Sequence, residues 1–445
     1  MFEESATEWP LLPLSEFIQR LDAGVSVNSE DRPHGAGEVG VLKTSALSGS
    51  VFNANENKAV LPAEKRLVAE PVSGDTILVS RMNTPELVGI ACYVKYPHPD
   101  LFLPDRIWQA KKKNGCALDM RWLSYQLQTE GYRRFLGAHA TGTSGSMKNL
   151  PKSSFLGMKL HFPKVDEQRL IARILDALDT QIQKTEALIA KLEKVKEGLL
   201  HDLLTRGIDE NGRLRPSPEQ APELYKESPL GLIPREWELC TVGGLGSWKG
   251  GSTPSKSNPG FWPESGILWV SPKDLVSDEI HETEDKISER AAQSSNLFIF
   301  PAGSVLVVFR SGILRKRLPV VRAGKDFTVN QDLKALIPSD GIAEEFVKYL
   351  LQGNADRILM KSVKAGTTVE SLDYKFFSSY EVALPRKFEQ YKISTALKKI
   401  EERINYERDL TKKLKKDKSG LMDDLLTGRV RVTPLLDQAQ ATTPA

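Results

Sequence analysis

Cysteine is scarce in this sequence of 445 residues, and long apolar runs are missing. The three cysteines (Cys92, Cys116 and Cys240) are widely separated and include no Cys-x-x-Cys pair, so the sequence predicts neither a disulfide framework nor a zinc site. No apolar run approaches the roughly 20 residues that a membrane-spanning helix requires. The acidic start, MFEESATEWP, has no signal-peptide pattern. Together these absences predict a protein of the reducing cytoplasm with no membrane partner.

Common catalytic motifs are also missing. The sequence has no Gly-x-x-x-x-Gly-Lys-Ser/Thr phosphate loop, no His-Glu-x-x-His and no Gly-x-Ser-x-Gly. NPGF at Asn258–Phe261 resembles the NPPF signature of adenine methyltransferases, but glycine replaces the second proline and no glycine-rich cofactor loop precedes it. We therefore interpret NPGF as a turn before the strand GILWV. Catalysis by this chain alone is not expected, nor is a cofactor or metal ion bound to it.

An internal duplication dominates what is present. Shifted by 222 positions, Pro163–Thr205 aligns without a gap with Pro385–Thr427, and 17 of the 43 aligned residues are identical. The repeat includes the helix ends GLLHDLLTRG and GLMDDLLTGR. Upstream, GDTILVSR from Gly74 parallels GSVLVVFR from Gly303, and EWPLLPL near the start parallels EWELCTV in the second half. The chain is therefore one unit of about 220 residues used twice.

Each copy has two parts that differ in hydrophobic period. Short β-branched runs such as TILVS and GIACYV, broken by Gly, Pro, Asn and Ser, predict a compact α+β domain with helices near Leu123–Leu136 and Ala343–Leu359. Apolar residues at intervals of three, four or seven then predict one long helix of roughly 60 Å. The predicted segments are a first globular domain at 1–162, a first long helix at 163–207, a Pro-rich connector at 208–235, a second globular domain at 236–384, a second long helix at 385–430 and a flexible tail at 431–445.

The two helices are predicted to pair with each other in antiparallel fashion, because most of each apolar stripe would overhang a small domain. Packing of each stripe on its own domain is the alternative. The positions predicted for helix pairing and partner docking are Leu178, Ile182, Leu192, Leu199, Ile400, Ile404, Leu414 and Leu421. Polar residues occupy other heptad slots and indicate polar surface available to another protein: Thr185, Lys196, Glu407, Thr411 and Lys418.

Two similar domains and two antiparallel helices give the chain pseudo-twofold symmetry. Such symmetry suits a target with two separate halves, and half-sites read from one face of duplex DNA lie roughly 10 to 10.5 bp apart. The net charge of +3 is weak evidence for this partner, because nucleic-acid-binding proteins concentrate positive charge on one face.

With this duplicated architecture and its repeated motifs, the sequence resembles the specificity subunit of type I restriction-modification enzymes. The motifs that carry the resemblance are FPKVDEQRLIARILDALD, LPRKFEQYKI, LLHDLLTRG, DDLLTGR and YKESPLGLIPREWE. The resemblance implies two target-recognition domains separated by two long helical spacers. It also implies a non-catalytic reader of double-stranded DNA that docks methyltransferase subunits, expected to be two, which supply S-adenosylmethionine and adenine methylation. Restriction subunits with nuclease and translocase activity are possible further partners.

Candidate DNA contacts follow from side-chain chemistry. Arg81 and Arg310 end equivalent strands, where a guanidinium is placed to bind guanine O6 and N7 or a phosphate. A surface arginine held in an ion pair is the alternative at both positions. The run Arg315–Arg317 and the loops TGTSGSMKN and AGTT offer phosphate contacts, whereas the run Lys111–Lys113 is more typical of a solvated loop. The predicted DNA-binding residues are Arg81, Thr143, Ser144, Lys148, Arg310, Arg315, Lys316, Arg317 and Thr367.

Two other classes of function stay open from the sequence alone. One is a coiled-coil scaffold that joins two protein-binding domains without sequence-specific DNA binding. The other is an enzyme with its own methyltransferase or nuclease activity. The bases that each domain reads and the length of DNA between them do not follow from these patterns.

Overall fold

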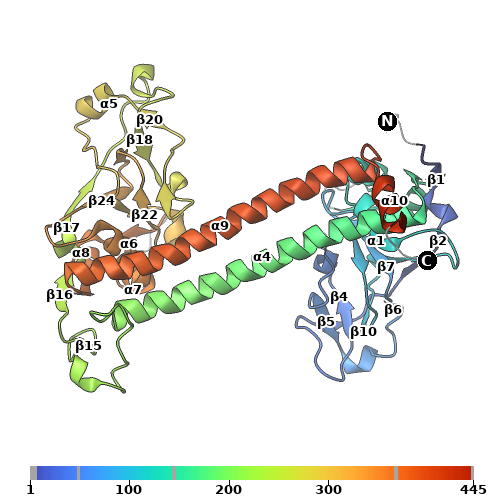
Figure 1. The fold of residues 1–445 in the computed structure, drawn as a ribbon, viewed down its shortest axis with the longest axis horizontal. Coiled ribbons are helices and arrows are strands. Elements are labelled where there is room, and N and C mark those ends of the chain that lie inside the picture. Colours follow the sequence, from blue (N-terminus) through green and yellow to red (C-terminus); the bar gives the residue numbers. More distant parts are fainter. Residues whose placement is uncertain (1–7, 48–50, 143–146, 365–368, 442–445) are drawn as a thin grey trace. The chain divides into compact units, whose positions relative to one another are not determined.

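The structure is a computed structural model that describes residues 8–47, 51–142, 147–364 and 369–441. The chain divides into two compact units, whose elements are labelled in Figure 1. The first unit contains the residues up to Glu186 together with those from Asp409 onward, and the second contains Ala187–Arg408. Each unit therefore combines one globular domain with parts of both long helices.

The globular domain of the first unit contains two main sheets. A four-stranded antiparallel sheet has the order β2 (Ile18–Ala23), β11 (Ile107–Lys112), β7 (Thr76–Ser80) and β9 (Ala91–Val94). A five-stranded mixed sheet has the order β3 (Ser29–Glu30), β5 (Asn57–Val60), β4 (Gly40–Leu42), β10 (His98–Phe102) and β6 (Pro71–Val72). Two short pairs are β1 (Leu11–Pro13) with β13 (Lys159–His161) and β8 (Met82–Asn83) with β12 (Lys148–Asn149). The helices are α1 (Met120–Gln126), α2 (Glu130–His139) and α3 (Lys152–Leu156), with 3-10 turns η1 (Leu14–Glu16), η2 (Thr44–Leu47) and η3 (Pro62–Glu64).

The globular domain of the second unit repeats this plan. Its larger sheet has the order β17 (Gly246–Gly250), β24 (Leu333–Pro338), β21 (Val305–Val308), β22 (Val320–Ala323) and β19 (Glu279–Ile280). The smaller sheet has the order β20 (Lys286–Ile287), β18 (Ile267–Val270) and β23 (Phe327–Val329), and two short pairs are β16 (Glu238–Thr241) with β27 (Glu381–Leu384) and β25 (Val363–Lys364) with β26 (Ser371–Leu372). The helices are α5 (Glu289–Ser294), α6 (Glu344–Gly353), α7 (Ala355–Ser362) and α8 (Tyr374–Ser378), with 3-10 turns η5 (Val242–Leu245), η6 (Pro259–Phe261), η7 (Pro272–Asp274) and η8 (Gly312–Arg315).

Four neighbouring strands have the same order in the two domains, which confirms the predicted α+β duplication. The order β2-β11-β7-β9 in the first domain matches β17-β24-β21-β22 in the second, and the other main sheet of each domain contains a parallel pair (β4 with β10, β18 with β23). Two glycines mark the same close backbone approach. A Cβ atom at Gly24 would lie 1.6 Å from the Leu103 carbonyl oxygen, and one at Gly251 would lie 1.6 Å from that of Val329. Only glycine fits at either position.

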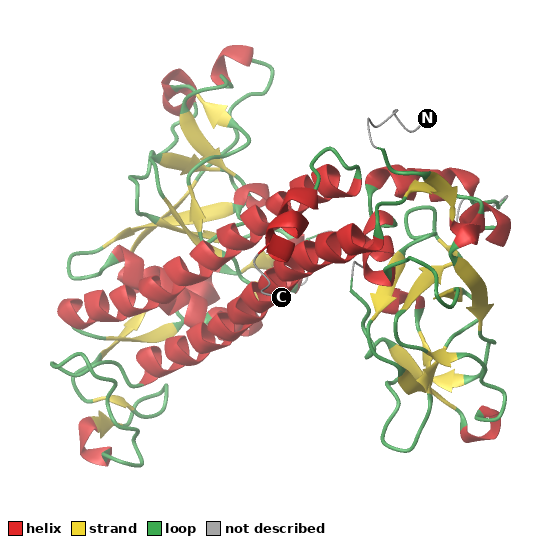
Figure 2. Cartoon of the chain, turned by 45° about the vertical axis from the view of Figure 1, so that its right-hand side comes forward, coloured by secondary structure: helices red, strands yellow, loops and turns green. Residues whose placement is uncertain are grey.

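The long helices are α4 (Val165–Thr205, 41 residues) and α9 (Lys387–Leu426, 40 residues), close to the predicted ranges. They lie side by side in Figure 1 and in Figure 2. In the first unit the N-terminal part of α4 contacts the C-terminal part of α9, through Asp179 and Lys418. In the second unit the C-terminal part of α4 contacts the N-terminal part of α9, through Lys196 and Glu401. Within each unit the helices therefore run antiparallel.

The repeated helix ends complete the core of the other copy's domain. Leu425 and Leu426, at the end of α9, are buried in the hydrophobic core of the first domain. Leu203, at the end of α4, is buried in the core of the second domain, and Leu204 packs against it. The Gln126 side chain also donates a hydrogen bond to the Leu426 carbonyl oxygen at 2.7 Å. The two copies of DLLT are thus equivalent packing elements, exchanged between the two halves of the chain.

A buried carboxylate near the start of each long helix strengthens this exchange. Glu167 of α4 accepts hydrogen bonds from Arg431, which follows the end of α9. Glu389 of α9 accepts from Arg215, which follows the end of α4, and from Trp237 Nε1 at 3.1 Å. The neighbouring glutamines, Gln168 and Gln390, also correspond. Their side-chain oxygens accept from the backbone N–H of the N-cap residue of α1 and of α6 respectively, each at 2.8 Å.

A second carboxylate in each helix ties the helix pair to the adjoining domain. Glu401 accepts from Lys348 and Tyr349 of α6 and from Lys196 of α4, at 2.6 to 2.8 Å. Burial alone would raise the pKa of Glu401, but the ammonium groups of Lys348 and Lys196 outweigh it and leave that pKa below its usual range. Asp179, at the equivalent position of α4, accepts from Tyr125, Arg121 and Lys418 in the same way.

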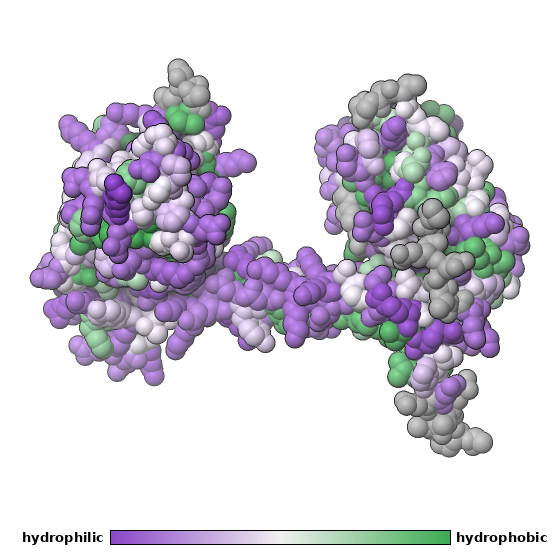
Figure 3. All heavy atoms as spheres, turned by 90° about the horizontal axis from the view of Figure 1, so that it is seen from above, coloured by the Kyte–Doolittle hydropathy of each residue, from purple (hydrophilic) through white to green (hydrophobic). Residues whose placement is uncertain are grey.

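These contacts correct the expectation that the polar heptad slots offer free polar surface. Lys196 and Lys418 are largely buried in the ion pairs just described. Thr185 is buried and donates to the Gln181 carbonyl oxygen, Glu407 is buried and pairs with Arg403, and Thr411 is buried. A polar side chain is tolerated on the paired face here because a neighbouring group satisfies its charge or hydroxyl. The exposed face of the helices seen in Figure 3 is nevertheless largely hydrophilic.

The ends of the predicted segments also differ from expectation. Residues 431–445 were predicted to be a flexible tail, but Arg431 is ion-paired, Val432 is buried, and α10 (Thr433–Ala441) follows. The reason is that the tail carries the residues that close the base of the first domain. The Pro-rich connector does end the helix, as predicted, but it is ordered: it forms η4 (Pro222–Leu224) and the strand pair β14 (Tyr225–Lys226) with β15 (Ile233–Pro234).

Glu389→Gln is expected to loosen the connector. Removing one member of a buried ion pair costs about 3 to 5 kcal/mol, and Glu389 also holds the Ile208 backbone N–H and Trp237. Trypsin cleavage after the exposed Arg213 should therefore accelerate at least tenfold under native conditions. Glu402→Gln, which changes an exposed carboxylate on the same helix, is the matched control. Equal cleavage rates in both variants would contradict the assignment.

Candidate nucleic-acid interface

A polar loop cluster lies at one end of the four-stranded sheet in the first domain, where β2 and β7 end and β11 begins. We define the first loop cluster as Ser26, Arg81, Asp105 and Arg106. Ser26, which follows β2, donates a hydrogen bond to Asp105 Oδ1 at 2.8 Å. Arg81, which directly follows β7, donates its backbone N–H to the Arg106 carbonyl oxygen at 3.0 Å. The residues before β11 therefore hold the ends of β2 and β7 together.

The second domain repeats this arrangement with other side chains. We define the second loop cluster as Thr253, Arg310, Gln331 and Asp332. Thr253, after β17, donates to Gln331 Oε1 at 2.7 Å, and the Arg310 backbone N–H donates to the Asp332 carbonyl oxygen at 3.1 Å. Ser26, Arg106, Thr253, Arg310 and Gln331 are exposed. Each domain thus presents the same loop geometry with a different set of donors and acceptors.

The two predicted strand-end arginines differ in their surroundings. The Arg81 guanidinium lies over the Trp108 ring at 5.6 Å, and its buried Nε has no hydrogen-bond partner within the described residues. Arg310 Nε instead donates to Asp332 Oδ1 at 2.8 Å, although 58% of the Arg310 side chain is exposed. Arg81 is therefore held by stacking with its charge not neutralised by a carboxylate in the described chain, whereas Arg310 is held by an ion pair.

Two side chains of the basic run Arg315–Arg317 in the second domain already form contacts within the chain. Arg315, at the end of η8, is exposed and pairs with Glu370, and this pairing lowers the pKa of Glu370. Arg317 donates to the Leu275 carbonyl oxygen at 3.4 Å, and Lys316 is exposed. In the first domain Lys111 forms ion pairs with Asp22 and Glu70, so its charge is neutralised within the domain.

The glycine-rich loops adjoin the strand-end arginines. Thr143, Ser144 and Thr367 lie outside the described residues. Lys148 lies on β12, which pairs with β8 immediately after Arg81, and its Nζ donates to the Gly142 carbonyl oxygen at 3.2 Å. In the second domain an isolated bridge joins Arg310 to Ser371 of β26. Lys148 therefore lies on the strand that pairs with the segment directly after Arg81. In the second domain, Arg310 itself is bridged to β26, which follows the second glycine loop.

The eight leucine and isoleucine positions predicted for helix pairing and partner docking are buried to differing extents. Ile182 and Ile404 are buried, and the other six are half-buried. This placement suits a role in helix pairing. Their role in docking a partner stays a prediction.

Sequence reasoning missed six members of the two loop clusters. It identified Arg81 and Arg310 but not Ser26, Asp105, Arg106, Thr253, Gln331 or Asp332. A usable signal was the repeated glycine followed two residues later by a hydroxyl residue, Gly24 with Ser26 and Gly251 with Thr253. The contact across to the loop before β11 or β24 required the fold.

The NPGF segment forms a turn, and the described residues contain no metal-binding cluster. NPGF forms η6, in which Asn258 Oδ1 accepts from the Gly260 backbone N–H at 3.1 Å, so it is the predicted turn before β18. In the part of the chain that the structure covers, no group of three or more His, Cys, Asp or Glu side chains is arranged to bind a metal ion. Nor does any described helix carry an apolar stretch long enough to cross a lipid bilayer.

Comparisons with known proteins agree with this architecture. A family model described as the type I restriction modification DNA specificity domain matches residues 21–194 and 234–416. The EcoR124I/EcoR124II specificity subunit of Escherichia coli is 35% identical over 181 residues, which cover 41% of this chain and 45% of that protein. The MjaIX specificity subunit of Methanocaldococcus jannaschii is 31% identical over 195 residues, which cover 43% of this chain and 44% of that protein. Both matches span less than half the length of the relative.

A solved structure shows the same fold over nearly the whole chain. The S subunit of a type I restriction-modification system from M. genitalium aligns with a TM-score of 0.59 and 14% identity, covering 96% of this chain and 98% of that one. The two similar α+β domains and the long helices of this chain thus belong to a fold found in a solved structure. Because the family model matches both copies and most of the sequence, the chain belongs to the type I restriction-modification DNA specificity family.

Arg81→Gln and Asp332→Asn are expected to change DNA retention in opposite directions. The first removes a cation without a carboxylate partner, and the second frees Arg310 from its ion pair. On immobilised random-sequence duplex, Arg81→Gln should elute at lower salt and Asp332→Asn at higher salt. One lost phosphate contact should reduce the salt-dependence slope by about 0.9. Arg134→Gln, an exposed change on α2, is the control, and a shift as large as that of Arg81→Gln would contradict the assignment.

Proposed function

We propose that the chain is the sequence-specific DNA-binding specificity subunit of a type I restriction-modification complex. It reads a bipartite target on double-stranded DNA, with one half-site for each domain. The observation that carries the proposal is the repeated loop cluster: two equivalent sheet ends, built on the same close glycine approach, present different polar side chains.

Different side chains at equivalent positions predict different half-sites. Asp105 and Arg106 of the first loop cluster offer a carboxylate acceptor and a guanidinium donor, which suit cytosine N4 and guanine O6 and N7. Gln331 of the second loop cluster offers an amide, which suits adenine N6 and N7. The shared fold would fix the approach to DNA, and these polar groups would distinguish the bases.

In this proposal, contacts to the phosphate backbone of DNA supply the rest of the binding affinity. Lys148, Lys316 and Arg317 lie on or beside the loops next to the strand-end arginines and suit phosphate oxygens. Such contacts position a protein on the duplex without reading its sequence, and they make binding depend on salt.

The chain itself is proposed to be non-catalytic. Methyltransferase subunits, two in the expected complex, would dock on the exposed faces of α4 and α9 and bind S-adenosylmethionine, and restriction subunits would join where the system cleaves DNA. The relatives in this family are named specificity subunits, and one similar structure belongs to a study of complex assembly in the type I R-M system. We expect the complex to act in the cytoplasm.

Methylation mapping tests the proposed function. The chain is expressed with and without its neighbouring methyltransferase genes, and modified adenines are sequenced in the host DNA. The expected result is a split motif, two short specified blocks around a fixed unread gap, that appears only when both are present. Methylation by the chain alone would instead indicate an enzyme. No dependence on the chain, despite a confirmed complex with an active methyltransferase, would indicate a scaffold.

A further inference from the structure

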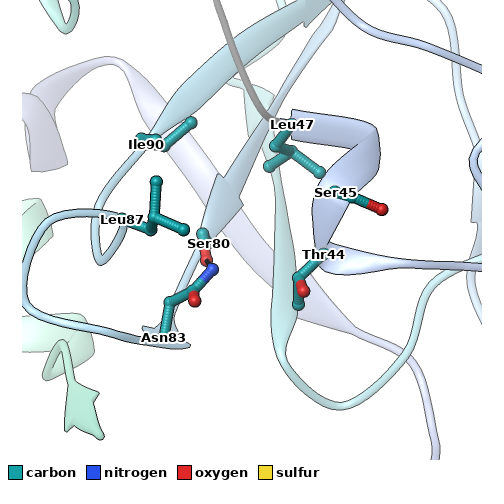
Figure 4. A pocket seen from close by; sticks show the side chains of 7 residues that line it. All are labelled: Thr44, Ser45, Leu47, Ser80, Asn83, Leu87 and Ile90. Carbon is teal, nitrogen blue, oxygen red and sulfur yellow. Dashed lines mark hydrogen bonds between the residues drawn. The ribbon is translucent and has the colours of Figure 1, made fainter. Parts of the chain in front are cut away.

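A hollow of about 140 Å³ opens in the first domain beside Arg81 (Figure 4). It lies between η2, the end of β7 and the loop that leads to β9. In Figure 4 the side chains of Leu87 and Ile90 face those of Leu47 and Thr44 across it. Leu47 is buried, whereas Leu87 is 39% exposed at the rim. One wall of the hollow is therefore a partly exposed apolar side chain.

The loop that forms this wall is tightly held. The Leu87 and Val88 backbone N–H groups donate to the Thr84 carbonyl oxygen at 3.0 and 2.9 Å, and Gly89 N–H donates to the Ser80 carbonyl oxygen at 2.8 Å. Gly89 has a φ of 74°, and a Cβ there would lie 3.0 Å from Leu136 Cβ. The hollow is thus shaped by backbone hydrogen bonds and packing rather than by a loose loop.

An oriented amide borders the hollow. Asn83 Nδ2 donates to the Oγ of the buried Ser80 at 3.1 Å, and Asn83 Oδ1 accepts from the Thr84 backbone N–H at 2.9 Å. An asparagine amide has two N–H donors and two lone pairs on its oxygen, so the hydrogen bonds among the described residues leave one of each for a ligand. That pair matches the N7 acceptor and N6 donor of adenine in the major groove. Ser45, also at the hollow, donates to Glu56.

A positive charge near the hollow favours DNA as its occupant. Lys148 lies directly opposite Asn83 in the β8–β12 pair, so the two side chains lie on the same face of that pair. Among base pairs seen from the major groove, only those with thymine carry a methyl group. An apolar hollow beside an amide suited to adenine therefore matches an A·T pair.

We infer that the hollow receives the C5-methyl group of a thymine in the half-site read by the first domain, with Asn83 on the adenine edge beside it. This inference rests on the proposed function and adds Leu87 and Asn83 as specificity-determining residues. The corresponding segment of the second domain, Ser311–Arg317, forms η8 and contains no asparagine. The effect is confined to one half-site, so the other half-site is an internal control.

Deoxyuridine substitution tests this inference, because it removes only the methyl group of thymine. The full chain, in complex with its methyltransferase partners, is titrated with target duplexes in which each thymine is replaced in turn. At one position in the first half-site, deoxyuridine should weaken binding about fourfold, the value for one buried methyl-sized group. Leu87→Ala should bind thymine and deoxyuridine duplexes equally there. Leu67→Ala, an exposed leucine in the same domain, should keep the wild-type difference.

Asn83→Ala provides a second readout. It should abolish the loss of affinity that 7-deazaadenine causes at the adjoining adenine in the wild-type complex. A first half-site with no deoxyuridine-sensitive thymine, or a sensitivity that persists in Leu87→Ala, would overturn the inference and leave the proposed function intact. A complex that binds no bipartite target would overturn both.

Discussion

The packing of each helix end into the other copy's domain is the constraint on which the rest of the structure depends. Leu203 and Leu204 complete the second domain, and Leu425 and Leu426 complete the first. The buried carboxylates Glu167 and Glu389 fix these ends through Arg431 and Arg215. Leaving such a carboxylate unpaired is costly. The ion pairs therefore fix the position of each helix end, in addition to the apolar contacts of its leucines. A domain of either copy therefore has its base built by residues from both halves of the sequence.

The two domains share the construction of their base and differ in the side chains of their loop clusters. The base of each domain is fixed by the helix ends, by Gln168 or Gln390 at a helix N-terminus, and by Asp179 or Glu401 beneath a buried tyrosine. At the end of the sheet, the loop clusters keep their backbone contacts while their side chains differ. A scaffold with this division can present two different reading surfaces on one chain, which is what a bipartite DNA target requires.

Much of this fold could be predicted from the sequence, because duplication and hydrophobic period are local signals. The ranges of α4 and α9, the α+β class and the turn at NPGF follow from them. The polar heptad slots were misinterpreted because Lys196 and Lys418 are satisfied by carboxylates far away in the sequence, which periodicity does not reveal. The tail after Arg431 was misjudged for the same reason. Of the loop clusters, the sequence indicated only Arg81 and Arg310, since the other members meet through tertiary contacts.

Hydrogen exchange of a chain that ends at Arg408 tests the exchange of helix ends most directly. Deleting residues 409–445 removes the α9 segment and the residues after it that belong to the first unit. The account predicts faster amide exchange in β1 and α1 of the first domain, although none of their own residues is changed, and unaltered exchange in β21 and β24 of the second. Full protection of β1 and α1 in the shortened chain would contradict it.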